Sequence, residues 1–269
     1  MKEQYAEGIK IIKRKRKFKV LGIFALSIVC ILMVCSFSSI LSKTLNLRNF
    51  SLASLILGQG NNKIEKHTLY AVTLGEFEDK KQCQDVALGS SVAGASGYVW
   101  KNSDKSYYAI GSIYSSLEDA QKVSEGLQSS VYTVEIKEIN FKEVSFDITK
   151  KDKDVISLCV QSLSYLNDLY NNFQTTCVQL EKGEISYVAS ASFINAYKSE
   201  IKTYETKFDL LLKENSDDVV KKLLAGFVSI ETSLDNTVNT LLSNFSPVSD
   251  IKYGLADFVF NYHSLILVI

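Results

Sequence analysis

The hydrophobic pattern changes period several times along the chain, and each change marks a new segment. From Val20 to Leu41 there is no charged residue, and as a helix this stretch covers roughly 33 Å at about 1.5 Å per residue. That length predicts one transmembrane helix at residues 20–41. A cleaved signal peptide is the alternative, but the apolar run is longer than the apolar region of such peptides.

Residues 42–65 show no apolar period and end in turn-forming residues, so we expect a linker there. Residues 66–140 then alternate between the period of a strand and that of a helix, and Ser115 or Ser116 is expected to cap the second helix. The predicted elements are strands at 67–74, 97–101, 107–114 and 131–139, with helices at 78–92 and 117–127. The order is βαββαβ.

Residues 150–269 carry helical periodicity. Apolar residues recur at spacings of three and four over 154–182 and 185–214, as in a coiled-coil seam. Gly183 is expected to end the first of these helices, and Ser216 to cap a third. Pro247 begins a fourth helical segment. Short links between long helices predict an antiparallel bundle of three or four helices.

The distribution of charge adds an orientation. The 30 Lys and Arg residues balance the 30 Asp and Glu residues, but basic residues gather in 1–19 and leave the rest of the chain acidic. The positive-inside rule then predicts a single-pass protein of the cell membrane, with the N-terminus cytoplasmic and the body extracytoplasmic. Each base from Lys13 to Lys19 should attract anionic lipid by about 1 kcal/mol. The acidic body argues against nucleic acid as a partner.

The sequence contains few residues in patterns that are typical of a catalytic site. The two histidines, His67 and His263, stand in no HExxH, CxxC or GxSxG pattern. A packed or exposed histidine is the expected role for both. The sequence therefore predicts a protein that is not an enzyme and that has no cofactor and no metal site.

Five cysteines occur in the chain, and Cys30 and Cys35 belong to the predicted membrane helix. On one continuous helix, Cys159 and Cys177 are roughly 27 Å apart at about 1.5 Å per residue, too far for a disulfide. We therefore expect Cys83, Cys159 and Cys177 to be free thiols in the core.

Two related half-motifs, Tyr70–Phe77 and Tyr107–Ala120, each join an apolar strand to the start of a charged helix. This pair resembles the bacterial sporulation-related repeat, the SPOR domain, over about residues 66–140. The resemblance implies a ferredoxin-like sheet that binds septal peptidoglycan glycan strands lacking stem peptides. The expected fold class is thus α+β, with an N-terminal transmembrane helix, a ferredoxin-like βαββαβ SPOR-type domain and a C-terminal antiparallel helical bundle.

A sheet face with aromatic rings suits a sugar chain, because rings pack on the apolar faces of pyranoses. Strand alternation places Thr73 opposite Val72 and Leu74. Whether Tyr98 and Trp100 face the groove or the core is left open by the pattern. The predicted glycan-binding residues are Thr73, Tyr98, Trp100, Tyr108, Ile110 and Ser112.

The predicted function is non-catalytic binding of peptidoglycan glycan strands at the septum, in cell division or sporulation. The alternative is an envelope scaffold whose degenerate SPOR domain and helical bundle bind proteins. In the bundle, Tyr197 and Tyr204 are expected at the edges of the helical seam, where their hydroxyls reach solvent. The alternative is a groove that these two rings form beside the apolar tail 265–269 and on which a helical protein partner docks.

Overall fold

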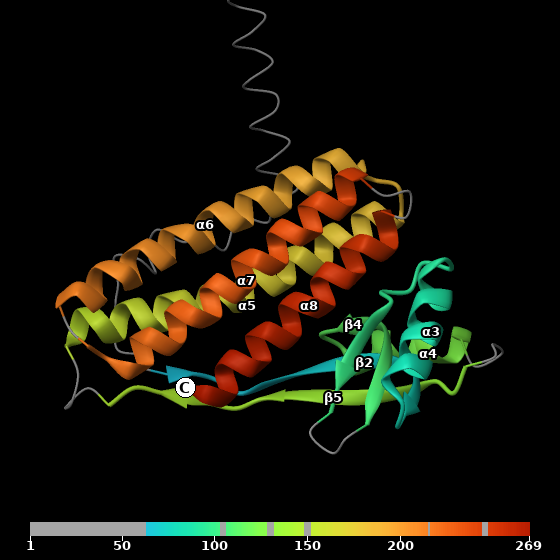
Figure 1. The fold of residues 1–269 in the computed structure, drawn as a ribbon, viewed down its shortest axis with the longest axis horizontal. Coiled ribbons are helices and arrows are strands. Elements are labelled where there is room, and N and C mark those ends of the chain that lie inside the picture. The colour runs from blue at the N-terminus through green and yellow to red at the C-terminus, as the bar shows by residue number, and fades with distance from the viewer. Residues whose placement is uncertain (1–62, 103–105, 128–131, 148–151, 215, 244–246) are drawn as a thin grey trace, which may run out of the picture. The chain divides into compact units, whose positions relative to one another are not determined.

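The protein is described by a computed structural model that covers residues 63–102, 106–127, 132–147, 152–214, 216–243 and 247–269. The chain divides into two compact units, Met1–Leu57 and Gly58–Ile269, and every described residue belongs to the second unit. This described part is α+β, with six helices and two small antiparallel sheets (Figure 1).

The larger sheet has the strand order β3-β4-β2-β5, and all of its neighbouring strands are antiparallel. Two helices interrupt the strands in sequence, so the element order in this part of the chain is βαββαβ, as the pattern predicted. The elements are β2 (His67–Phe77), α3 (Lys80–Ser91), β3 (Tyr98–Lys101), β4 (Tyr107–Tyr114), α4 (Leu117–Leu127) and β5 (Glu135–Phe141).

Helix α3 packs on one side of this sheet. The core between them contains the buried residues Leu74, Cys83, Ala87 and Ala109. The side of the sheet that bears Tyr98 and Trp100 is instead contacted by the C-terminal helix. Both sides of the sheet are therefore packed against helices.

The helix starts follow the capping rules, with one shift. The Asp79 carboxylate accepts from two backbone N–H groups in the first turn of α3, and the Ser116 hydroxyl accepts from one in α4. At α7 the cap is Asp217, which accepts from two backbone N–H groups, and not Ser216 as predicted. A carboxylate one position later accepts hydrogen bonds from the free backbone N–H groups of the first turn, and its negative charge is attracted to the positive end of the helix dipole.

The second sheet was not predicted. It pairs β1 (Lys63–Ile64) with β6 (Val144–Ser145), so the last residues of the expected linker 42–65 form a strand. It adjoins the end of the β2–β5 ladder at which His67 pairs with Phe141. A two-residue strand is too short to produce a recognisable alternation, which is why the pattern did not reveal it.

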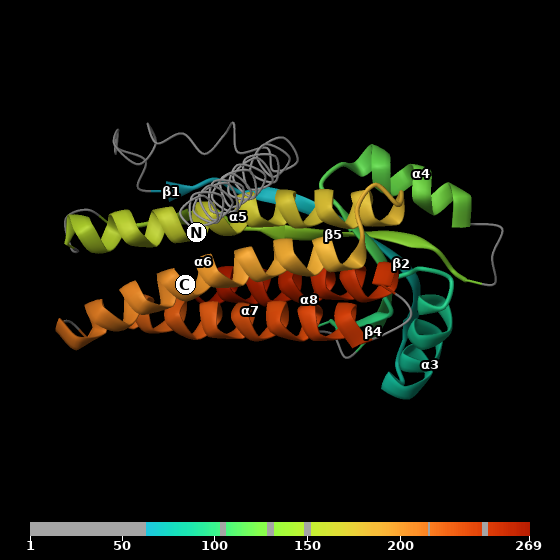
Figure 2. The same cartoon turned by 90° about the horizontal axis from the view of Figure 1, so that it is seen from above.

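Four long helices form the antiparallel bundle (Figure 2). They are α5 (Lys153–Glu181), α6 (Tyr187–Glu214), α7 (Asp218–Ser243) and α8 (Pro247–Val268). Helix α5 contacts α6 and α8, and α7 also contacts α6 and α8. Gly183 follows the end of α5 with a φ of 70°, a left-handed conformation that glycine adopts without strain.

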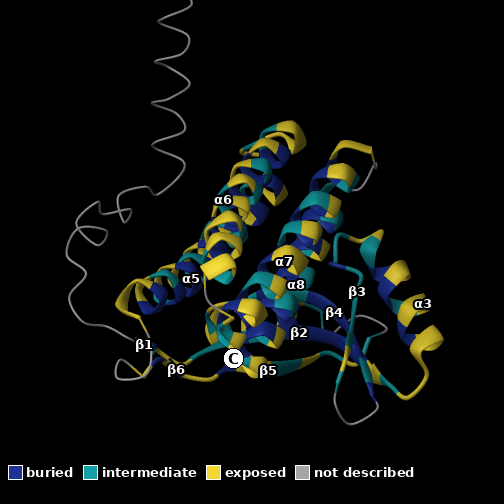
Figure 3. Cartoon of the chain, turned by 60° about the vertical axis from the view of Figure 1, so that its left-hand side comes forward, coloured by how far each residue is buried: buried dark blue, intermediate teal, exposed yellow. Residues whose placement is uncertain are grey.

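Helix α8 belongs to the bundle and to the sheet at once. Besides α5 and α7, it contacts β3, β4 and β5. Strand β4 is largely buried where α8 meets the sheet (Figure 3). Sheet and bundle therefore share one packed interface.

Among the helices of the described residues, none combines the length and apolar composition that a bilayer crossing requires. The described residues therefore do not support the expected single-pass anchor. For these residues the expected fold class is corrected to α+β without a transmembrane helix, and the expected location in the cell membrane, with a cytoplasmic N-terminus and an extracytoplasmic body, is likewise not supported. The stretch 20–41, the basic residues 1–19 and most of the linker lie outside the described residues.

Candidate functional site

An aromatic surface spans strands β3 and β4. Trp100 pairs with Tyr108 across the ladder, and Tyr98 pairs with Ile110. Directly paired residues of an antiparallel ladder point to the same side, so these four side chains share one side of the sheet. The ring centroids of Trp100 and Tyr108 are 5.5 Å apart. We call Tyr98, Trp100 and Tyr108 the aromatic face.

Helix α8 lies on the aromatic face through Phe260. The Phe260 ring centroid is 4.8 Å from that of Trp100, with an interplanar angle of 20°, and 5.3 Å from that of Tyr98, with an angle of 11°. Stacked ring pairs of this kind contribute about 0.5–1.5 kcal/mol each beyond burial. Tyr253 adds an edge contact with Tyr98 at 5.2 Å. Tyr98 and Trp100 are accordingly half-buried against α8.

Tyr98 also makes a polar contact with α8. Its hydroxyl is hydrogen-bonded to the carboxylate of Asp257. Burial raises the pKa of Tyr98 above its usual value of 10, and the negative charge of Asp257 raises this pKa further. The phenol therefore stays protonated at neutral pH and donates its hydrogen bond to Asp257.

A polar cluster adjoins Tyr108 on the sheet. Glu76 pairs with Tyr108 in the β2–β4 ladder, and hydrogen bonds from Ser106 and Tyr108 lower the pKa of the Glu76 carboxyl. The Lys137 ammonium lies 5.1 Å from the Tyr108 ring centroid, a cation–π distance. Because Glu76 is exposed, this cluster reaches solvent beside the aromatic face.

The other predicted glycan-binding residues lie within the sheet and contact its own strands. Ile110 is fully buried. Thr73 pairs with Ile110, and its buried hydroxyl donates to the carbonyl of Glu135 at 3.2 Å. Ser112 is half-buried opposite Val72. The β2–β4 register shifts after Val72 and again after Thr73, so simple alternation does not continue along β2.

Three residues of the site were not predicted from the sequence. Tyr253, Asp257 and Phe260 are spaced at i, i+4 and i+7, which places them on one stripe of α8. This stripe could have been recognised from the sequence. The sequence does not say that the stripe faces a sheet, because a bundle helix has no local feature that identifies its distant partner.

Both histidines lie at a second contact between α8 and the sheet. The His67 ring is stacked on Phe141 at 4.4 Å and 10°, and the His263 ring meets Phe141 edge-on at 5.2 Å. His263 Nε2 is also 3.2 Å from the carbonyl oxygen of Asn140. Burial lowers the pKa of both imidazoles from 6.5. They are therefore neutral packing groups near pH 7.

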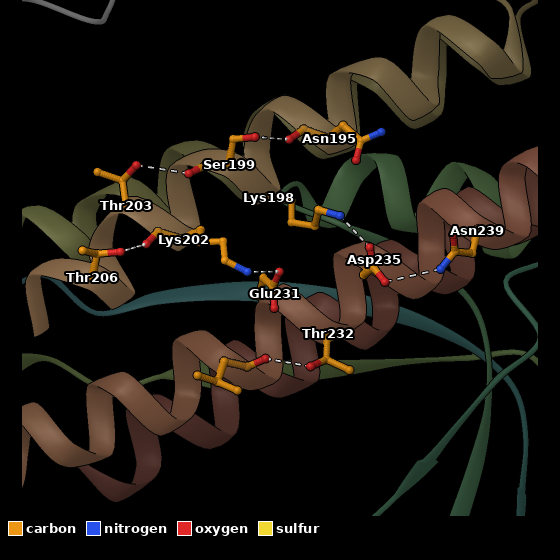
Figure 4. A network of polar contacts seen from close by, with 11 residues as sticks. Asn195, Lys198, Ser199, Lys202, Thr203, Thr206, Glu231, Thr232, Asp235 and Asn239 are labelled. Carbon is orange, nitrogen blue, oxygen red and sulfur yellow. Dashed lines mark hydrogen bonds and ion pairs between the residues drawn. The ribbon is translucent and has the colours of Figure 1, made fainter. Parts of the chain in front are cut away.

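A polar network joins α6 to α7 (Figure 4). The Nζ atoms of Lys198 and Lys202 are 2.5 Å and 3.4 Å from carboxylate oxygens of Asp235 and Glu231, respectively. Asn239 donates to the second oxygen of Asp235 at 3.4 Å. The hydrogen bond from Lys198 lowers the pKa of Asp235. Each acid is paired with a base from the neighbouring helix, so the network holds the two helices together.

The structure contradicts the alternative of a groove at Tyr197 and Tyr204. Tyr197 and Tyr204 are only 7% and 8% exposed. Leu265 and Ile266 of the apolar tail are buried as well. The two tyrosine rings therefore belong to the bundle core and offer no open surface to a helical partner.

The described residues contain no group of three or more His, Cys, Asp or Glu side chains that could hold a metal ion. Cys83, Cys159 and Cys177 are buried, and each is a thiol rather than half of a disulfide, which confirms the prediction for them. Burial raises the pKa of Cys83 to about 11, so its thiol is protonated at neutral pH.

No protein-family model, no curated protein and no solved structure matches the chain. The resemblance to the SPOR family therefore rests on the two half-motifs, Tyr70–Phe77 and Tyr107–Ala120.

Proposed function

We propose that the chain is a non-catalytic protein that binds denuded glycan strands of peptidoglycan through the aromatic face. The supporting observation is the aromatic face itself, three rings on one side of a sheet, with Glu76 and Lys137 beside them. Rings pack on the apolar faces of pyranoses, while charged and hydroxyl groups bond to the sugar edges. A role at the septum, in division or sporulation, is proposed from the SPOR resemblance.

The contact of Phe260 with the aromatic face supports this proposal. Its ring lies nearly parallel to the rings of Trp100 and Tyr98. A pyranose presents a flat apolar face of similar size, and its contact with an aromatic ring has the same stacked geometry. The aromatic face therefore has flat ring surfaces of the kind on which a pyranose would stack.

Binding of the full chain to sacculi, treated or not treated with amidase, tests the proposal. We expect enrichment on treated sacculi, in which the stem peptides have been removed. Trp100→Ala should weaken this binding about tenfold, because a lost stacking energy of about 1.4 kcal/mol corresponds to that factor. Trp100→Phe keeps a ring and should retain most of the affinity.

Tyr187→Ala is the matched control, because Tyr187 is an exposed aromatic residue on α6. It should leave binding unchanged. Equal retention of the chain on treated and untreated sacculi would exclude denuded glycan as the ligand. Equal losses for Trp100→Ala and Tyr187→Ala would exclude the aromatic face as the site.

A protein scaffold is the second candidate, and one observation favours it. Phe260 already fills the surface that a glycan would need. In a scaffold, the sheet and bundle would bind a protein as one unit, and glycan affinity would be absent. Septal localisation of the unmodified chain and of the Trp100→Ala variant alike, with neither protein enriched on amidase-treated sacculi, would support the scaffold over the glycan-binding protein.

A further inference from the structure

The centre of the aromatic face is part of the buried contact between α8 and the sheet. The ring of Phe260 stacks on those of Trp100 and Tyr98, and Phe260 itself is only 6% exposed. Tyr108 is only 5% exposed. A pyranose cannot take a ring face that another ring already fills. A sugar that contacts the folded chain therefore needs an aromatic ring at the margin of this contact.

Tyr253 of α8 provides such a ring. Among the described Tyr, Phe and Trp residues, only Tyr253 and Tyr187 are classed as exposed. Tyr253 adjoins the aromatic face, because its ring centroid is 5.2 Å from that of Tyr98, with an interplanar angle of 62°. Tyr187 lies on α6. The exposed part of Tyr253 therefore extends the aromatic surface from β3 onto α8.

Polar groups converge beside Tyr253. Asp257 follows it by one turn of α8, and the carboxylate of Asp257 accepts the hydrogen bond of the Tyr98 hydroxyl. Burial, and then the negative charge of Asp257, raise the pKa of Tyr253, so this carboxylate lies close to both phenols. A carboxylate has about four acceptor sites, and the bond from Tyr98 uses one of them. The others are available to the hydroxyls of a ligand.

The negative charge of Asp257 is not neutralised by a base. Lys252 is the only lysine of α8, and its Nζ lies 2.7 Å from a carboxylate oxygen of Glu181 and donates to the carbonyl of Gly94 at 3.1 Å. Within the described part of the chain, no lysine or arginine forms an ion pair with Asp257. A charged carboxylate is a strong acceptor for hydroxyl groups and repels anions. The chemistry beside Tyr253 therefore favours an uncharged sugar.

On the basis of the glycan binding proposed above, we propose that Tyr253, Asp257 and Tyr98 form a subsite that binds the N-acetylglucosamine residues of a glycan strand. We call these three residues the rim site. The pyranose packs on the ring of Tyr253, and its hydroxyls donate to Asp257. N-acetylglucosamine is uncharged, whereas each muramic acid residue of a denuded strand carries a lactyl carboxylate that Asp257 repels. Helix α8 completes this site while it stays packed on the sheet.

Isothermal titration calorimetry of the full chain tests the ring of the rim site. The ligands are a linear hexamer of β-1,4-linked N-acetylglucosamine and glycan strands released from amidase-treated sacculi. Tyr253→Ala should weaken the binding of both about tenfold, the factor expected for the loss of one stacked ring. Tyr253→Phe keeps the ring and should retain most of the affinity. Tyr187→Ala removes the exposed ring of α6 and should change neither affinity.

Asp257→Asn tests the charge, because asparagine has a similar shape and still accepts from Tyr98. The unmodified chain should prefer the uncharged hexamer to the strands by about threefold, the factor for two like charges about 6 Å apart in water. Asp257→Asn should weaken the binding of the hexamer and remove this preference. If the variant weakened the binding of both ligands by the same factor, the selection of an uncharged sugar by Asp257 would be overturned.

The remaining outcomes separate the rim site from the function on which it rests. Unchanged affinity in Tyr253→Ala, together with loss of binding in Trp100→Ala, would keep the glycan function and overturn the rim site. Equal losses in Tyr253→Ala and Tyr187→Ala would also overturn the rim site. If the unmodified chain bound neither ligand, the glycan function and the rim site would both be overturned.

Discussion

His67 and His263 meet at one ring, that of Phe141, and their protonation should control how firmly α8 is held there. Burial lowers the pKa of both imidazoles in the folded chain, whereas in the unfolded chain the pKa is close to 6.5. Protons therefore bind preferentially to the unfolded state. The stability that the two neutral imidazoles contribute is present above about pH 6.5, and it is lost as the pH falls towards the pKa of the folded state.

We predict that the urea midpoint of unfolding falls when the pH is lowered from 7.5 to 5.5. The double variant His67→Gln, His263→Gln should show a smaller fall, because glutamine does not titrate and its amide can still donate to the carbonyl of Asn140. An equal fall in both proteins would show that other groups cause the pH dependence.

At the scale of an element, the approach of α8 to α7 depends on glycine. A Cβ added at Gly254 would clash with the side chain of Thr237 on α7, whereas one added at Gly89 on α3 would meet no atom within 4 Å. We predict that Gly254→Ala lowers the free energy of unfolding by about 1–3 kcal/mol, the usual cost of overpacking. Gly89→Ala is the matched control and should raise this free energy by about 0.4–1 kcal/mol. Urea denaturation measures both, and equal effects would contradict the close approach.

At the scale of the whole molecule, the shared helix α8 should make sheet and bundle unfold together. The described residues form part of one compact unit, and Phe260 and His263 both join α8 to the sheet. Trp100 fluorescence reports on the sheet, while far-UV circular dichroism is dominated by the helices. We predict that the two probes give coincident urea transitions, as a two-state unit requires. A Trp100 transition at distinctly lower urea would show that the sheet opens separately, with a stable bundle left behind.

The local elements were largely readable from the sequence. The alternation of apolar and polar residues predicted the strand at Tyr107–Tyr114. Apolar residues at spacings of three and four predicted long helices, and the observed ends of these helices differ from the predicted ends by one to a few residues. Capping chemistry predicted Ser115 or Ser116 as the cap of α4, and in the structure the cap is Ser116. The strand pair β1–β6 was missed, because two residues carry no period.

The sequence by itself also determined the chemistry of the candidate site, since strand alternation places Tyr98 and Trp100 on one side of the sheet and the stripe Tyr253, Asp257 and Phe260 on one side of α8. Only the tertiary structure decided that these two surfaces meet. Periodicity fixes which residues share a face, because it follows from the geometry of the local backbone. It does not fix which distant element covers that face, because aromatic surfaces pack on each other without a strict directional code and many pairings bury similar area.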